Sequence, residues 1–255
     1  MEVVHETVWG GRVTLAQPLR GQKVGIDPVL LAHFVPDGPF AQAADLGAGN
    51  GVVAVLLAAG GKARQVEAVE IMADMAFLAR RSVNLNRLDD RVRVQEEDLR
   101  RWASREENRG RFDLVTCNPP YRALGFGNLP PDPLKASHRF EVHLKLCELA
   151  AAVASLLGRG GVAAFIYSRS RKEEFLSTFE QAGLHPQVMQ DIRPRQGEPV
   201  QRFLALLGRD RAALRHLPDL VLHPSAPDEG GKYTPAVEAI LRPGRRPINT
   251  TNPRS

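Results

Sequence analysis

The sequence predicts a three-layer α/β fold built on a mostly parallel β-sheet. Short apolar segments alternate along the chain with amphipathic segments of helical length, and glycine-containing turns separate them. Strands that alternate with helices in this way form βαβ units, which place parallel strands in one sheet and helices on both of its faces. No internal repeat competes with this interpretation.

Hydrophobic periodicity and glycine placement define the individual elements. Residues 50–60 form an apolar run that Gly60 and Gly61 close, a pattern typical of the C-terminus of a helix. The other expected helices are residues 72–88, 141–161 and 171–183. The expected strands are residues 41–47, 64–71, 90–99, 111–117, 162–168, 185–192 and 201–208.

The last two expected strands follow one another without a helix between them, so we expect them to pair antiparallel at one edge of the sheet. Residues 1–241 are predicted to form a single domain, of which residues 1–40 are an N-terminal extension. The glycine- and proline-rich residues 122–139 indicate a long functional loop rather than a linker. The tail from about residue 242 is expected to be disordered.

The composition is that of an ordinary soluble globular protein. The chain of 255 residues is 43% hydrophobic and 25% charged, and it is long enough to bury one large core. No run approaches the roughly 18 apolar residues of a membrane span, and the N-terminus lacks a signal-peptide pattern. The net charge of +5 mildly favours an anionic partner.

Only two cysteines occur, Cys117 and Cys147. Two cysteines cannot make a disulfide framework or a four-ligand zinc site, so we expect a reducing cytoplasm and no metal. Both side chains are expected to be small buried apolar groups rather than nucleophiles.

Residues 193–215 are rich in arginine. Two interpretations remain open at this point: a solvated helix and strand edge, or a face that contacts phosphates. The cations of this stretch are Arg193, Arg195, Arg202, Arg209, Arg211 and Arg215, against the acids Glu198 and Asp210.

The first chemical signal is the sequence DLGAGNG at residues 45–51, between the first strand of the expected sheet and its helix. Glycines there permit a tight turn and the close approach of a ligand to the backbone, and the helix N-terminus offers free amides. The third glycine arrives one residue too early for the dinucleotide fingerprint, which argues against a nicotinamide dehydrogenase. Any tight turn from a strand to a helix also uses glycine, so the motif is weak evidence by itself.

Further polar groups follow the next three strands. Glu70 ends the second strand, where a carboxylate could hold both hydroxyls of a ribose, and Asp98 follows the third, within reach of an adenine amino group. Either acid alone could equally be an ordinary surface group. The fourth strand runs into Asn118-Pro119-Pro120-Tyr121. Because two consecutive prolines cannot continue a sheet, they end the strand and rigidly present Asn118 and Tyr121.

In this order, the sequences DLGAGNG, AVEI, EEDL and NPPY resemble the class I S-adenosylmethionine-dependent methyltransferases that methylate amines. That resemblance implies a Rossmann-like, three-layer fold with a mostly parallel seven-stranded sheet and an antiparallel edge strand. Residues 23–31 (KVGIDPVLL) and the ending at residues 220–241 (LVLH…GGKYTPAVEAIL) are similar to the bacterial tRNA(Val) adenine-N6 methyltransferase family. The resemblance covers nearly all of residues 5–241, and Tyr233 in the ending is expected to pack the last helix.

The resemblance implies S-adenosylmethionine as the cofactor and tRNA as the partner, with a monomer favoured and no membrane contact. The glycine turn would cradle the methionine part, Glu70 would hold the ribose, and Ile71 would lie against the adenine. Asp98 would accept from the adenine amino group, with Leu99 beside it. The implied cofactor-binding residues are Lys23, Gly25, Asp27, Asp45, Gly47, Ala48, Gly49, Gly51, Glu70, Ile71, Asp98, Leu99 and Asn118.

The resemblance also implies that Asn118 to Tyr121 form the catalytic motif and hold an adenine of the RNA, with Tyr121 stacked on the base. The implied substrate-binding residues are Tyr121, Arg122, His138 and Arg139. The family usually has adjacent arginine and histidine before a glutamate, whereas this chain has His138-Arg139-Phe140-Glu141. An ordinary loop histidine is therefore the alternative interpretation of His138.

Two alternative functions stay open. The NPPY motif also serves methyltransferases that modify a glutamine of a translation release factor, but these usually carry a helical N-terminal domain, and only about 40 residues precede the first expected strand here. The other alternative is an RNA-binding protein that keeps the fold without catalysis. The intact Asn118 and Tyr121 argue against that possibility.

Overall fold

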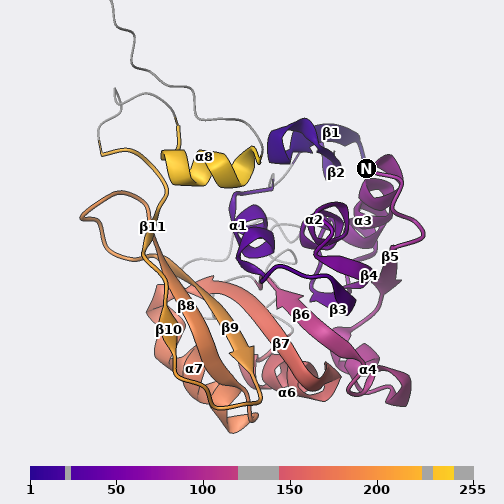
Figure 1. The fold of residues 1–255 in the computed structure, drawn as a ribbon. Helices are drawn as coiled ribbons and strands as arrows, with labels where there is room; N and C mark the ends of the chain where they lie inside the picture. The colour runs from indigo at the N-terminus through magenta and orange to yellow at the C-terminus, as the bar shows by residue number, and fades with distance from the viewer. Residues whose placement is uncertain (21–23, 120–143, 226–231, 244–255) are drawn as a thin grey trace, which may run out of the picture.

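The computed structural model describes residues 1–20, 24–119, 144–225 and 232–243. Its central sheet has the strand order β10-β8-β9-β7-β6-β3-β4-β5, and β11 also pairs with β8 (Figure 1). The strands are β3 (Phe40–Leu46), β4 (Ala63–Glu70), β5 (Val92–Glu96), β6 (Phe112–Cys117), β7 (Leu157–Ser168), β8 (His185–Arg193), β9 (Arg202–Gly208), β10 (Arg215–His216) and β11 (Leu220–Val221). The predicted α/β fold class is confirmed.

The antiparallel strand lies inside the sheet and not at its edge. Strands β3 to β7 pair in parallel, whereas β9 pairs antiparallel with both β7 and β8. The expected antiparallel pairing of the last two long strands is therefore present. Because β8 follows a helical crossover that skips one place in the sheet, β9 fills the skipped place when the chain turns back. The two-residue strands β10 and β11 then cover the outer side of β8.

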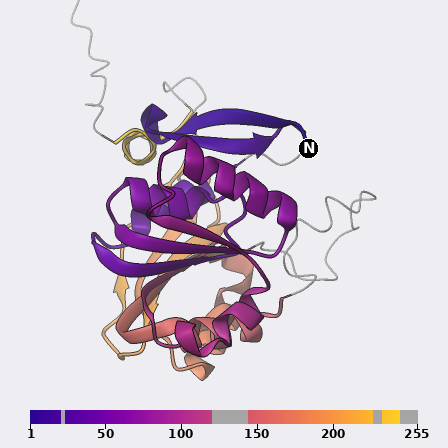
Figure 2. The same ribbon diagram turned by 90° about the vertical axis from the view of Figure 1, so that its right-hand side faces the viewer.

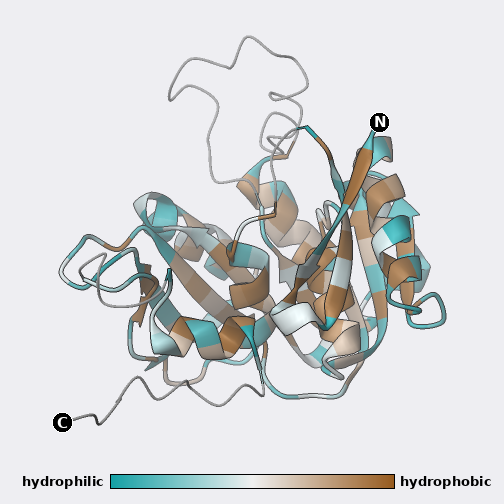
Figure 3. Cartoon of the chain, turned by 90° about the horizontal axis from the view of Figure 1, so that it is seen from above, coloured by the Kyte–Doolittle hydropathy of each residue, from teal (hydrophilic) through white to brown (hydrophobic). Residues whose placement is uncertain are grey.

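Helices cover both faces of the sheet, as Figure 2 shows. Two separate clusters of buried apolar side chains, one on each face, hold these layers together. The helices of one face are α1 (Asp27–Phe34), α2 (Val52–Ala59) and α3 (Ala73–Leu85), with α8 (Pro235–Leu241) packed beside α1. Those of the other face are α4 (Leu99–Ala103), α6 (Leu146–Leu156) and α7 (Lys172–Gln181). In Figure 3, hydrophobic segments follow the strands and alternate with hydrophilic ones on the helices.

The long helix expected over residues 141–161 ends earlier, because Leu157 already begins β7. A Cβ atom on Gly158 would lie 2.7 Å from the Gly110 carbonyl oxygen, and one on Gly161 would lie 2.8 Å from that of Phe112. Gly158 and Gly161, which suggested a helix C-terminus, instead allow the backbone at the start of β7 to pack closely against the backbone of β6. Residue 99, expected as the end of a strand, begins the short helix α4 instead.

The N-terminal extension forms a β-hairpin, which periodicity alone does not predict. Strands β1 (Val3–Val8) and β2 (Val13–Pro18) pair antiparallel across the short 3-10 helix η1 (Trp9–Gly11). Side chains of α3 and of the residue that caps its C-terminus bind this hairpin: the Ala16 amide donates to Ser82 Oγ at 3.0 Å, and the Thr14 amide donates to Asn86 Oδ1 at 3.0 Å. The hairpin is therefore fastened along α3.

Two expectations fall on segments outside the described residues: the functional loop over 122–139, and the disordered tail beyond residue 243. In the described ranges, no helix is long and apolar enough to cross a bilayer. The prediction that both cysteines are buried is correct for Cys117 and wrong for Cys147, which is exposed on the first turn of α6. Burial raises the pKa of the Cys117 thiol well above its usual value, which disfavours a nucleophilic role.

Candidate functional site

Strand register brings three of the predicted motifs to one edge of the sheet. Leu46 at the end of β3 is paired with Cys117 at the end of β6 and with Val69 in β4. The residues that follow these positions are the glycine turn (Gly47 to Gly51), Asn118 and Glu70. Ligands of open α/β sheets bind at the carboxyl ends of the parallel strands, so this edge is the candidate active site.

The glycine turn uses backbone conformations that other residues rarely adopt. Gly47, Gly49 and Gly51 have φ angles of 68°, 56° and 82°. A Cβ atom on Gly51 would also lie 3.2 Å from the Cβ of Ala79 in α3, so this glycine lets the turn pack against α3. The side chain of Asn50 inside the turn donates to the Ala16 carbonyl of the hairpin at 3.0 Å. The turn is therefore held by β2 and α3 as well as by its own strand.

Glu70 binds the turn through its side chain. Only 3% of Glu70 is exposed. One carboxylate oxygen accepts from the Gly49 amide at 2.8 Å, and the other accepts from the Met72 amide at 2.9 Å. The next residue, Ile71, is 42% exposed, so its apolar side chain is accessible next to Glu70.

Asp45 is a buried acid directly beneath the glycine turn. It is 2% exposed, its Oδ1 accepts from the Thr116 hydroxyl at 2.8 Å, and its Oδ2 is buried without a hydrogen-bond partner among the described residues. Burial raises the pKa of Asp45 to about 7; the hydrogen bond from Thr116 and the proximity of the Ala54 amide oppose this rise, and nearby Glu70 adds to it.

The unsatisfied oxygen of Asp45 shows what kind of group the turn can accommodate. A buried carboxylate oxygen is costly until a donor or a cation reaches it. The ammonium group of an amino acid supplies both, and the adjacent glycines leave the backbone open for its carboxylate and side chain. The residues present therefore fit the methionine part of S-adenosylmethionine.

Asp98 lies at the predicted place, two residues after the end of β5. It caps α4: its carboxylate accepts from the Arg100 amide at 2.8 Å and from the Arg100 guanidinium at 2.5 to 3.1 Å. These contacts with Arg100 lower the pKa of Asp98, so its carboxylate is ionised. The proposed contact between Asp98 and the cofactor adenine would share these oxygens with Arg100. Leu99 beside it is buried.

The segment before α1 also reaches the carboxyl edge of the sheet. The Val24 amide donates to Gln17 Oε1 at 2.9 Å, and Asp27 forms an ion pair with Arg202 at the start of β9. Arg202 is paired with Ser168, the last residue of β7, so the ion pair places the start of α1 at this edge. Gly25 and Asp27 thus lie near the predicted region. Lys23 lies outside the described residues.

Asn118 is half-buried and Pro119 is buried at the end of β6. The remaining residues of the predicted catalytic and substrate-binding sets lie outside the described residues: Pro120, Tyr121, Arg122, His138 and Arg139.

The arginine-rich stretch does not form one continuous cationic face. Arg193 pairs with Asp219, and Arg202 with Asp27, while Arg209 donates to the carbonyl oxygen of Leu157 at 3.2 Å. These contacts favour a structural role for the three side chains. Sequence reasoning missed the partners because each contact joins segments far apart in the chain.

No group of three metal-ligating side chains occurs within the described ranges. The observed edge brings together the glycine turn, the acidic strand ends Glu70 and Asp98, and Asn118 with Pro119.

Comparison with known proteins agrees with this geometry. The methyltransferase small domain family matches residues 24–127. A protein of Trichodesmium erythraeum named tRNA1(Val) (adenine(37)-N6)-methyltransferase is 30% identical over 207 residues, which cover 79% of this chain and 84% of that protein. The chain belongs to the bacterial tRNA(Val) adenine-N6 methyltransferase family. The resemblance predicted from the motifs is confirmed, and S-adenosylmethionine is the cofactor.

Further relatives of this methyltransferase support the assignment. A protein of the same name from Aeromonas salmonicida is 28% identical and covers 87% of this chain and 89% of its own length. Among solved structures, a predicted O-methyltransferase from Agrobacterium tumefaciens has a TM-score of 0.63 and 27% identity, covering 84% of this chain and 94% of its own. A geranyl diphosphate methyltransferase in complex with GPP and sinefungin has a TM-score of 0.54 at 16% identity, covering 72% of this chain and 77% of its own, and shows the shared fold.

The Asp27–Arg202 pair allows a test of how the methyltransferase holds the segment before α1. Arg202→Met should lower the free energy of unfolding by about 1–3 kcal/mol, because it removes the guanidinium from a carboxylate that is largely buried. It should also raise the KM for S-adenosylmethionine several-fold, because the segment loses its contact with β9. Urea unfolding and steady-state kinetics measure the two effects.

Arg193→Met is the matched control, since Arg193 lies at the same end of the hairpin formed by β8 and β9, but its ion-pair partner is Asp219 and not the segment that begins α1. It should change the KM for S-adenosylmethionine little. Equal KM changes in both variants would contradict a specific role for Arg202.

Proposed function

We propose that this methyltransferase transfers the methyl group of S-adenosylmethionine to the exocyclic N6 amine of an adenine in tRNA, in the cytoplasm. The observation that carries the proposal is the register of β3 and β6, which sets Asn118 and Pro119 beside the glycine turn. The group to be methylated would therefore meet the cofactor across the gap between two neighbouring strand ends. The family membership and the net charge of +5 support an RNA substrate.

The cofactor supplies an electrophilic methyl group on a sulfonium. We assign its methionine part to Asp45 and the glycine turn, its ribose to Glu70, and its adenine to the exposed face of Ile71. Glu70 already accepts backbone hydrogen bonds at both oxygens, yet each carboxylate oxygen can accept more than one. The ribose hydroxyls would use this remaining capacity.

The chemistry required at Asn118 follows from the amine. The lone pair of an adenine amino nitrogen is delocalised into the ring, so the nitrogen is a poor nucleophile. Acceptors placed on its two hydrogens, the Asn118 side-chain oxygen and the Pro119 carbonyl, would draw the nitrogen toward tetrahedral geometry and aim its lone pair at the methyl carbon. Such catalysis depends on positioning and hydrogen bonds and needs no strong base.

Tyr121 is assigned to stacking on the adenine that leaves the RNA fold, a contact typically worth about 1–3 kcal/mol per base. Arg122, His138 and Arg139 are assigned to the RNA on the same side. The proline at position 119 would keep its carbonyl directed at the amino group, since its ring restricts the backbone.

The deciding experiment is incubation of the purified protein with labelled S-adenosylmethionine and total RNA from a strain lacking the gene, followed by nucleoside mass spectrometry. We expect N6-methyladenosine in the tRNA fraction. Label in a release factor and none in RNA would overturn the proposal in favour of glutamine methylation.

A further inference from the structure

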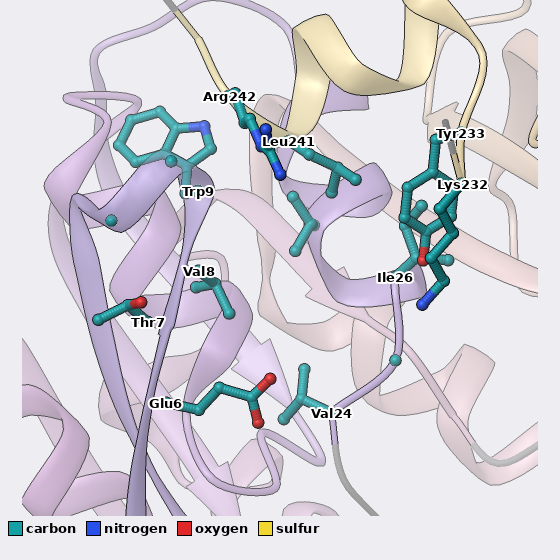
Figure 4. Close-up of a pocket in the computed structure, with 14 residues that line it drawn as sticks. Glu6, Thr7, Val8, Trp9, Val24, Ile26, Lys232, Tyr233, Leu241 and Arg242 are labelled. Atoms are coloured by element: carbon teal, nitrogen blue, oxygen red, sulfur yellow. The ribbon is translucent and has the colours of Figure 1, made fainter. Parts of the chain in front are cut away.

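A groove of about 710 Å³ lies between the N-terminal hairpin and the C-terminal helix (Figure 4). Strand β1 forms one wall with Glu6, Thr7 and Val8, and the end of α8 forms the other. The floor is apolar and consists of the segment that leads into α1, including Val24 and Ile26. None of the cofactor or substrate assignments above accounts for this groove, apart from Gly25 at its margin.

One end of the groove opens at the same edge of the sheet as the candidate active site. Strand β11 runs parallel to β8, and β8 is antiparallel to β9, so the chain leaves β11 at the carboxyl edge. The Thr234 amide donates to Leu222 just beyond β11, which keeps Lys232 and Tyr233 near this edge. On the other side of the groove lies Gly25, two residues before Asp27. The ion pair between Asp27 and Arg202 keeps this segment at the carboxyl edge, next to the end of β7.

An aromatic ring with a cation beside it stands at this end. Tyr233 stacks with His223, at a ring-centroid distance of 5.3 Å and an interplanar angle of 21°, and Lys232 Nζ lies 5.2 Å from the tyrosine ring. Lys232 is exposed, and Tyr233 is partly exposed as well.

The other end repeats the combination. Trp9 lines the groove with the Arg12 guanidinium 5.5 Å from its ring, and Arg242 at the end of α8 approaches Gly10 (Figure 4). The side chain of Arg242 is 52% exposed. Two aromatic rings, each with a cation beside it, thus mark the two ends of one groove, and the exposed Arg242 adds a third cation.

Aromatic faces combined with cations along a groove are the pattern by which proteins bind unpaired nucleotides, because the rings stack on bases and the cations neutralise phosphates. An acidic peptide would use the cations and leave the aromatic faces without a matching group. Resting on the proposed function, we propose that this groove binds unpaired nucleotides of the tRNA whose adenine enters the active site. Lys232 and Arg242 contact phosphates, and Tyr233 and Trp9 offer stacking faces.

The proposal is tested with Lys232→Glu and Arg242→Glu, each measured with unmodified tRNA and S-adenosylmethionine. We expect the KM for tRNA to rise about tenfold in each variant, and the salt dependence of binding to weaken by about one phosphate contact. The kcat at saturating tRNA and the Kd for S-adenosylmethionine should stay unchanged. Arg93→Glu is the matched control, since it reverses an exposed charge on β5, which contributes no residue to the groove.

A second measurement uses cross-linking from the groove wall. Benzoylphenylalanine in place of the exposed Thr7 should form adducts with tRNA, and excess unlabelled tRNA should suppress them. Adducts with another protein, or with the chain's own residues 244–255 in the presence of tRNA, would overturn the inference.

The two levels of proposal fail in different ways. If the unsubstituted protein methylates no tRNA, the proposed function fails. If it methylates tRNA and the Lys232, Arg242 and Arg93 variants share the same KM, only the groove's role is overturned.

Discussion

Asn118→Ala should reduce methyl transfer about 100- to 1000-fold while the Kd for S-adenosylmethionine stays within a factor of two or three. The expected loss follows from removing one of two acceptors that act on the amino group in the transition state; single preorganised hydrogen-bonding groups of this kind contribute about that much to rate. The side chain follows β6, whose backbone is fixed on both sides by β3 and β7. Single-turnover kinetics and isothermal titration calorimetry separate the two quantities.

Asn118→Asp is the informative companion variant. It keeps an acceptor oxygen at the same position but adds a charge and removes the amide donor, so it should retain more activity than the alanine variant toward an amine substrate. Unchanged single-turnover rates in Asn118→Ala would contradict the assigned role of this residue.

The second large effect concerns Asp45 and pH. The pKa of Asp45 is raised from 3.8 to about 7 in the folded protein. Between about pH 4 and about pH 7 the carboxyl group is therefore protonated in the folded state and ionised in the unfolded state. Stability should therefore fall as pH rises from about 4 to about 7, and this carboxyl alone should cost about 4 kcal/mol above pH 7. Asp45→Asn removes the titration, so it should flatten this part of the curve.

Urea unfolding of both proteins at pH 5 and pH 8, without cofactor, measures the difference. The free energy of unfolding of the variant, relative to that of the unsubstituted protein, should be higher at pH 8 than at pH 5. A wild-type protein that instead gains stability relative to Asp45→Asn on going from pH 5 to pH 8 would contradict the assigned sign.

Cofactor affinity provides an independent check of the same group. The ammonium of the methionine part favours the charged form of Asp45, so binding of S-adenosylmethionine should strengthen as pH rises through about 7. In Asp45→Asn this dependence should be lost and the affinity should be lower at pH 8. Calorimetric titrations at pH 6 and pH 8 compare the two proteins.

The sequence predicted the elements of the sheet well because their signals are local. Apolar runs of strand length, bounded by glycine and proline, identified β3 to β9 of the central sheet to within a few residues, apart from β7, which begins five residues earlier than expected. The start of β7 was missed because Gly158, Gly160 and Gly161 have the same local pattern as a helix C-terminus. Only the neighbouring backbone of β6 distinguishes the two uses of glycine.

The candidate site was predictable where one motif follows one strand. The glycine turn, Glu70 and Asn118 meet because parallel strands in adjacent places end at the same edge. The contacts of Asp98 with Arg100 and of Asp27 with Arg202 were not predictable in this way, since they depend on side-chain packing. The groove beside α8 is lined by segments more than 200 residues apart in the sequence, so no local sequence pattern predicts it.

The bond from Asn50 to Ala16 has a consequence for engineering the enzyme. The hairpin is not a detachable appendage, because its second strand supports the turn assigned to the cofactor, and its buried Gln17 also binds the Val24 amide. A truncation that starts the chain after β2, made to simplify crystallisation or expression, would remove one wall of the cofactor turn. Shortened or tagged versions of the enzyme should therefore keep residues 1–20 intact.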